Sequence, residues 1–109
     1  MESMQPPFAS REERMAYNQA WARTTNEHLA RWRRSDGEAS FRCECWQKEC
    51  GAELSLSAAD WDMARAKPNR FAVAPHHVAE GIETVILIRP NFWLLEKFGA
   101  AGRLAEKLA

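Results

Sequence analysis

The sequence predicts an α+β fold in which a long N-terminal helix packs on a small, mainly antiparallel sheet. Three observations support this prediction. The first third of the chain repeats apolar residues at helical spacing, the later part contains several short runs with strand character, and a cysteine-rich turn lies between two of those runs. We also expect a hairpin that holds zinc at the cysteines, and a short C-terminal helix.

Length and composition indicate one folded domain. The chain has 109 residues, 46% of them hydrophobic, with five Trp and five Phe. Residues 1–9, which include Pro6 and Pro7, are expected to form a flexible N-terminal arm. Residues 10–109 are expected to form a single zinc-stabilised α+β domain, because a core of this size gains useful stability from a structural metal.

The first predicted helix begins at Ser10 and extends to about Arg34. Ser10 and Glu13 have the spacing of a capping box, in which each side chain binds a backbone N–H group at the start of the helix. Residues 35–37, Ser-Asp-Gly, are expected to end it. The face predicted to point into the core carries Asn18, Trp21, Thr25, His28, Leu29 and Trp32.

The rest of the chain is predicted to alternate short strands and helices. Strands are expected over residues 39–45 and 52–57, on either side of the cysteine turn, and over residues 71–73. Ser57 and Asp60 form a second capping box, which predicts a helix that ends near Ala66. The strongest hairpin signal joins residues 84–89 to 92–97 through Pro90 and Asn91, and residues 99–108 are predicted to be helical.

The predicted hairpin is apolar at consecutive positions, over residues 85–88 and 92–95. Because neighbouring strand residues point to opposite faces, both faces of this sheet need cover. In one account the first helix covers one face and the terminal helix covers the other. In the alternative a second copy of the chain covers the second face, and the protein is a homodimer.

The tryptophans are predicted to divide into four inward residues and one outward residue. Trp21, Trp32, Trp61 and Trp93 occupy positions that the apolar pattern assigns to the interior. Trp46 lies in the cysteine turn beside charged residues, and we predict that it is the exposed tryptophan. In the alternative its ring shields the metal site from water.

The three cysteines of the chain, Cys43, Cys45 and Cys50, lie within eight residues. An odd and tightly clustered set does not form a disulfide framework, whereas gathered thiolates are what a soft divalent metal requires. We therefore predict a structural zinc site. The alternatives are reduced thiols that only pack in the core, and a redox switch. The charges of Glu44 and Glu49 are expected to raise the pKa values of these thiols in the metal-free protein.

Zinc prefers four ligands, so a fourth is expected from one of the histidines. His77 is the first candidate and His76 the second, because a loop just after a short strand can lie beside the cysteine turn. His28 occurs at helical spacing with apolar residues and is interpreted as a core histidine. The predicted metal ligands are Cys43, Cys45, Cys50 and His77.

Charge and targeting signals bear on location and partners. Lys and Arg total 15, as do Asp and Glu, so no overall field attracts nucleic acid or an anionic membrane. The N-terminus lacks a basic stretch followed by an apolar one, and no apolar run is long enough to span a bilayer. Clustered thiols without such a signal predict a cytoplasmic protein with no membrane contact.

No catalytic motif accompanies the cysteines, so we predict no enzyme activity. The predicted function is a non-enzymatic zinc-binding interaction module that binds a protein partner in a regulatory role. The alternative is a small zinc-containing nucleic-acid-binding protein, because Arg31-Trp32-Arg33-Arg34, with Arg42 and Trp46, offers cations and stacking groups together. These arginines also suit a solvated helix C-terminus, which zero net charge favours.

Two motifs follow each other in a distinctive order. They are Phe41-x-Cys43-Glu44-Cys45-x4-Cys50 and Arg70-Phe71-x-Val73-x-Pro75-x-His77. Most of the chain after about Tyr17 thereby resembles a family of small bacterial cytosolic proteins that carry F-x-C-E-C, a third Cys and R-F-x-V-x-P-G-H. The resemblance implies a zinc site with His77 as the matching ligand, and no particular activity. This sequence departs from the family where the glycine before the histidine is His76, which keeps His76 as a competing ligand.

Overall fold

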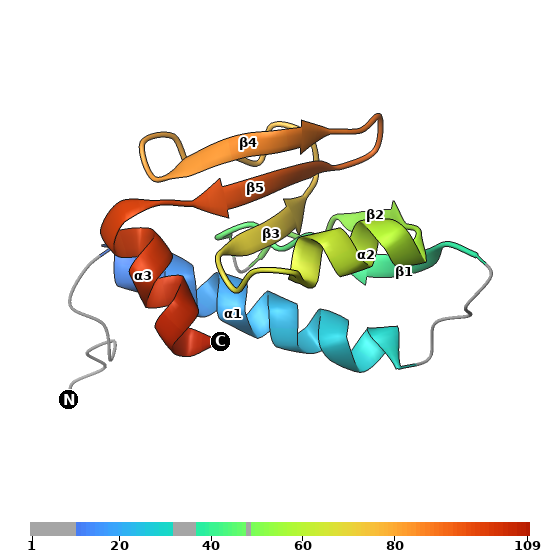
Figure 1. Cartoon of the computed structure of the whole chain (residues 1–109), viewed down its shortest axis with the longest axis horizontal. Coiled ribbons are helices and arrows are strands. Elements are labelled where there is room, and N and C mark those ends of the chain that lie inside the picture. The colour runs from blue at the N-terminus through green and yellow to red at the C-terminus, as the bar shows by residue number, and fades with distance from the viewer. Residues whose placement is uncertain (1–10, 32–36, 48) are drawn as a thin grey trace.

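The computed structural model describes residues 11–31, 37–47 and 49–109, and its fold is α+β, as predicted (Figure 1). The predicted arm over residues 1–9 and the cap at Ser10 lie outside the described residues. In chain order the elements are α1 (Arg11–Ala30), β1 (Ala39–Arg42), β2 (Glu53–Leu56), α2 (Ala58–Arg65), β3 (Arg70–Val73), β4 (Glu83–Ile88), β5 (Trp93–Lys97) and α3 (Gly99–Leu108).

The strands form two small antiparallel sheets. β1 pairs with β2, with Ala39 opposite Leu56, and the second sheet has the order β3-β5-β4. The two sheets meet where the chain leaves β1, because the backbone N–H of Glu44 donates to the carbonyl of Ala72 in β3 at 2.8 Å. α1 extends along the molecule beneath both sheets in Figure 1. This arrangement brings the turn after β1 next to the turn after β3.

The Ser57 half of the second predicted capping box is present at α2. Ser57 is the N-cap, and its side-chain oxygen accepts from the backbone N–H of Asp60 at 3.1 Å. α2 places Trp61 in the core, where its ring stacks on Phe41 with the centroids 4.7 Å apart. The core therefore joins α2 to the β1–β2 sheet.

The face of α1 that points inward is not the one predicted. Trp21 is 50% exposed, Leu29 is 43% exposed and His28 is also exposed, whereas the buried residues of this helix are Met15, Ala16, Gln19, Ala22 and Asn26. The prediction was wrong because it followed the large side chains of the helix. The inner face instead combines Met15 and two alanines with polar side chains that bind buried glutamates.

α1 also ends earlier than predicted. Its last residue is Ala30, and a turn in which the N–H of Arg31 donates to the carbonyl of His28 follows it, so the predicted end near Arg34 is wrong. Trp32 and the arginines at 33 and 34 lie outside the described residues.

The tryptophan prediction is wrong at two positions. Trp21 is half exposed rather than buried, and Trp46 is partly buried rather than exposed. Trp61 is fully buried, and Trp93 is partly buried. Trp21 lies outward because it belongs to the outer face of α1, where the guanidinium of Arg42 lies 4.6 Å from the centre of its ring.

The β4–β5 hairpin is covered unevenly. Leu94 and Leu95, neighbours on the central strand β5, are both buried, so both faces of that strand have cover. On the edge strand β4, Ile86 is 40% exposed and Ile88 is 65% exposed. α3 packs against α1 and β5, so the two helices do not cover opposite faces of the sheet as one account predicted.

A close backbone contact fixes the start of α3. A Cβ atom at Gly102 would lie 2.7 Å from the carbonyl oxygen of Lys97, so only glycine allows the helix to approach the end of β5 this closely. Of the described helices, none is long and apolar enough to cross a membrane.

Candidate metal centre

The structure brings Cys43, Cys45, Cys50 and His77 together. One ligand atom from each residue lies within 4.8 Å of all the others, so the cluster could hold a metal ion. Cys43 and Cys45 follow β1, Cys50 precedes β2, and His77 lies in the turn after β3. The cluster therefore forms only when the two sheets are docked.

The distances within the cluster suit a small tetrahedral ion. His77 Nδ1 lies 3.5 Å from Cys43 Sγ and 3.6 Å from Cys50 Sγ. Metal–sulfur bonds of about 2.3 Å and metal–nitrogen bonds of about 2.0 Å at tetrahedral angles give a sulfur–nitrogen separation of ~3.5 Å. The two sulfur–nitrogen distances therefore match such a site, and the remaining ligand atoms, which lie within 4.8 Å of one another, would need only a small inward rotation of the thiols.

Backbone hydrogen bonds hold the turns that carry these ligands. The N–H of Cys43 donates to the carbonyl of Ala52 at 3.0 Å, which closes the base of the cysteine turn. The N–H of Ala74 donates to Cys43 Sγ at 3.1 Å, and the N–H of His77 donates to the carbonyl of Ala74 at 3.1 Å. A donor aimed at sulfur stabilises negative charge there, as a thiolate ligand requires.

The other two histidines are directed elsewhere. His76 is exposed, and its ring packs against Trp93 with the centroids 4.5 Å apart. Its φ of 73° lies in the left-handed region that favours glycine. His28 lies exposed on α1 and is not the predicted core residue. The geometry therefore favours His77 over His76 as the fourth ligand.

The Cys43 and Cys45 thiols titrate as a pair. A hydrogen bond from the Cys43 thiol lowers the pKa of Cys45 from 9.0 to about 5, and the same interaction, together with burial, raises the pKa of Cys43. The pair therefore carries one thiolate at neutral pH. The pKa of Cys43 is raised as expected, but by burial and the contact with Cys45 rather than by the charges of Glu44 and Glu49, and the expected rise at Cys45 is not found, because the hydrogen bond from Cys43 lowers its pKa.

Sequence reasoning missed a polar network around Glu44. The Glu44 side chain is fully buried and binds Arg23 and Asn26 on the inner face of α1. Gln19, one helical turn before Arg23, donates both to the Glu44 carbonyl and to the buried Glu83 side chain. The signal in the sequence was the set of polar residues at positions 19, 23 and 26, which share one helical face.

Trp46 also ties the cysteine turn to α1. Asn18 Nδ2 donates to the backbone carbonyl of Trp46 at 2.9 Å, and the guanidinium of Arg11 lies 5.8 Å from the centre of its indole ring. These contacts explain why Trp46 is partly buried.

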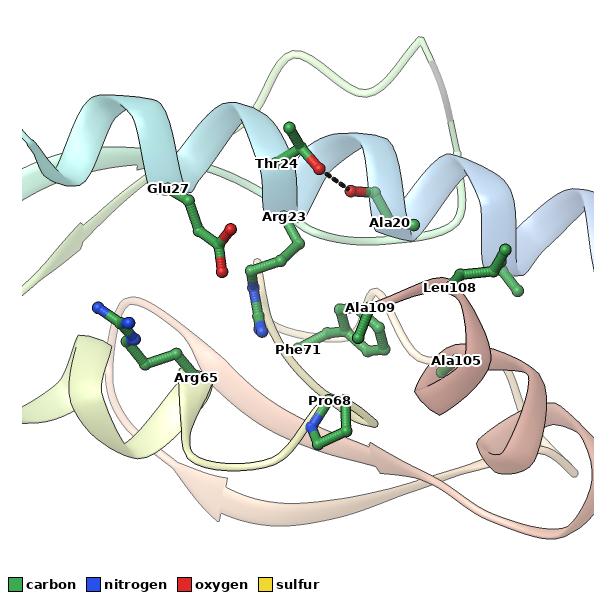
Figure 2. A pocket seen from close by; sticks show the side chains of 11 residues that line it. Ala20, Arg23, Thr24, Glu27, Arg65, Pro68, Phe71, Ala105, Leu108 and Ala109 are labelled. Atoms are coloured by element: carbon green, nitrogen blue, oxygen red, sulfur yellow. Dashed lines mark hydrogen bonds between the residues drawn. The ribbon is translucent and has the colours of Figure 1, made fainter.

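A separate pocket of about 200 Å³ lies between α1, α2 and α3 (Figure 2). Its lining combines apolar surface from Phe71 and Leu108 with the charged residues Arg23, Glu27 and Arg65. Arg23 is already bound to Glu44, and the described residues that line the pocket include no histidine or cysteine.

No family model, curated protein or solved structure matches this chain in comparisons with known proteins.

Proposed function

We propose that this chain is a non-enzymatic zinc module in which Cys43, Cys45, Cys50 and His77 hold one structural Zn²⁺. The observation that carries the proposal is the convergence of four soft ligands from three chain segments, with sulfur–nitrogen distances of 3.5 and 3.6 Å. Three thiolates and one imidazole are a donor set typical of structural zinc sites.

The ligand count favours a structural role over a catalytic one. Four protein ligands complete a tetrahedron, whereas catalytic zinc keeps a position for water or substrate. Each sheet contributes ligands, because the cysteines flank the β1–β2 pair and His77 follows β3. A bound ion would join the two sheets and stabilise their packing.

Cobalt substitution tests the donor set. Co²⁺ accepts the same ligands as Zn²⁺ and absorbs visible light according to its geometry. We expect the intense visible bands of a tetrahedral ion and near-ultraviolet charge-transfer bands from three thiolates, both displaced by zinc. Weak bands of a six-coordinate ion, or cobalt that zinc does not displace, would contradict the proposal.

The proposed partner of the module is a protein. The net charge is zero, and the outer face of α1 exposes Tyr17, Trp21 and Leu29. Arg42 lies over the Trp21 ring, and a groove beside it is lined by Thr25, Leu29 and Arg42, among other residues. Tyr, Trp and Arg are the residues enriched at the centres of protein interfaces.

Affinity capture from the native host tests this surface. We expect a protein that the native chain retains and that Trp21→Ala loses, while Met63→Ala retains it as a control from an exposed site on α2. Equal capture by both variants would contradict a role for the outer face of α1.

The second candidate function is nucleic-acid binding. It is favoured by two arginine–tryptophan pairs, Arg11 with Trp46 and Arg42 with Trp21, because bases can stack on such groups. Binding to mixed-sequence oligonucleotides at increasing salt concentration tests it. The absence of any binding at low salt would eliminate this candidate.

A further inference from the structure

A charged side chain is buried between two of the proposed metal ligands. Glu44 lies between Cys43 and Cys45 in sequence, and its side chain is fully buried. Residues on extended chain alternate sides, so Glu44 points away from the cluster while its two neighbours point into it. A buried carboxylate is costly unless it is paired and hydrogen-bonded.

Every oxygen of this carboxylate is bound. Arg23 approaches it with two nitrogens, Nε at 2.7 Å from Oε2 and Nη2 at 2.8 Å from Oε1. Asn26 Nδ2 donates to Oε2 at 2.9 Å, and the backbone N–H of Ala72 donates to Oε1 at 2.8 Å. The carboxylate therefore joins α1 to β3 at one point.

The Glu44 backbone is fixed on the same two elements. Its N–H donates to the carbonyl of Ala72 at 2.8 Å, and its carbonyl accepts from Gln19 Nε2 at 3.2 Å. Asn26 also binds both the N–H and the carbonyl of Arg42, the residue before Cys43. The segment that carries two of the four ligands is thereby held by side chains of α1.

We infer that Glu44 is a positioning residue of the metal centre: its contacts with Arg23, Asn26 and Ala72 hold Cys43 and Cys45 in the geometry that binds the ion. This inference rests on the proposed zinc site. It adds that metal affinity depends on the docking of α1, which contributes no ligand itself. A preorganised segment binds tightly because the ion does not have to order it.

Glu83 provides a matched control. It is also a buried glutamate, and it binds Gln19 at 2.7 Å, the N–H of Ala79 at 2.7 Å and Lys97 at 3.4 Å. It lies in β4 and reaches the cysteine segment only indirectly, through Gln19, which also donates to the Glu44 carbonyl. Because Gln at position 83 keeps a side-chain oxygen that can accept from Gln19, Glu83→Gln disturbs a buried ion pair but leaves the direct contacts of the cysteine turn in place.

The test is a zinc-affinity measurement by competition with a chromophoric chelator on the native chain, Glu44→Gln and Glu83→Gln. Gln is nearly the same shape as Glu but presents an N–H₂ group in place of one of the two oxygens that now accept. We expect at least a tenfold loss of zinc affinity in Glu44→Gln and a change of less than threefold in Glu83→Gln. Circular dichroism of the zinc-loaded proteins shows whether each variant is folded.

Each outcome decides the inference. Unchanged zinc affinity in Glu44→Gln would overturn the inference, because Glu44 would then have no part in positioning the ligands. Equal losses of affinity in both variants would also overturn it, because Glu44 would then act only through the general stability of the fold. If the native chain itself binds no zinc, the proposed function fails instead. Should Glu44→Gln not fold even with zinc, Arg23→Lys replaces it, since Lys keeps the charge but loses the two-nitrogen contact. We expect a loss of about threefold to tenfold there, and unchanged affinity would again overturn the inference.

Discussion

The two adjacent histidines have opposite environments, although they differ by one position in the chain. His77 Nδ1 faces two sulfurs, whereas His76 is exposed and has a φ of 73°. The change of backbone conformation at His76 directs its ring to Trp93 and leaves the next side chain directed at the cysteines.

We expect His77→Ala to weaken zinc binding by at least tenfold, because it removes one of four ligands. His76→Gly should bind zinc as the native chain does. It should also change the free energy of unfolding by no more than about 1 kcal/mol, since glycine relieves the left-handed conformation while the ring contact is lost. Isothermal titration with zinc and urea denaturation measure the two effects. A greater loss of affinity in His76→Gly than in His77→Ala would reverse the ligand assignment.

A second prediction at this scale concerns the metal-free protein at different pH. The pKa of Cys45 is lowered from 9.0 to about 5 by the hydrogen bond from Cys43. Between these values the unfolded chain binds more protons than the folded one, so the stability from this group is present at higher pH and is lost as pH falls toward 5. Urea denaturation of the metal-free chain from pH 5 to 8 should show rising stability, and Cys45→Ser should flatten the rise. A native profile as flat as that of the variant would contradict the thiolate assignment.

Part of the centre could be predicted from residues alone. The clustered, odd number of cysteines predicted the three sulfur ligands, and the position of His77 after a short strand predicted the fourth. The role of Glu44 was missed, although strand alternation already directed it away from Cys43 and Cys45. Its partner Arg23 could not be found without the docking of α1, because the two residues are distant in the sequence and charged helix residues usually face solvent.

At the scale of elements, the limits of the second helix and the C-terminal hairpin followed from local signals. Ser57 caps α2 as its spacing with Asp60 predicted, and Pro90 and Asn91 lie in the turn between β4 and β5. Such signals act through neighbouring backbone groups, so they need no tertiary information. The inner face of α1 was predicted wrongly because it depends on the partners that the helix meets.

The two faces of α1 should respond oppositely to substitution. Trp21→Ala removes a half-exposed ring and should change the free energy of unfolding by no more than about 0.5 kcal/mol. Asn26→Ala leaves groups of Glu44 and Arg42 without their partner and should cost about 1–3 kcal/mol. Urea denaturation of zinc-loaded protein measures both. A larger loss of unfolding free energy in Trp21→Ala than in Asn26→Ala would indicate that the face predicted from the apolar pattern points into the core.

At the scale of the whole molecule, the exposed edge strand β4 supports the prediction of a homodimer. Ile86 and Ile88 are exposed, and among the described residues one side of β4 has no neighbouring strand. We expect light scattering at micromolar concentration to give the mass of two chains, and Ile88→Lys to shift it toward one chain. Thr84→Lys is the control, because Thr84 is an exposed residue of the same strand. It adds the same charge without removing an apolar side chain. A single-chain mass for the native protein would exclude the dimer.

Metal binding and folding of the whole molecule should be coupled. The proposed ligands come from both sheets, and α1 holds the cysteine turn through Glu44, so the ion, the sheets and the helix should form one cooperative unit. Binding free energies of structural zinc are about 10 kcal/mol or more, as large as the whole stability of a small domain. Removal of zinc should therefore loosen the cysteine turn and the His77 turn together.

The most direct test of the account is the metal content of the purified native chain, determined by elemental analysis together with Cys43→Ser, Cys45→Ser and Cys50→Ser. We expect about one zinc per native chain and loss of that zinc in each of the three variants. A native chain that contains no metal and folds as well as it does with added zinc would contradict the account.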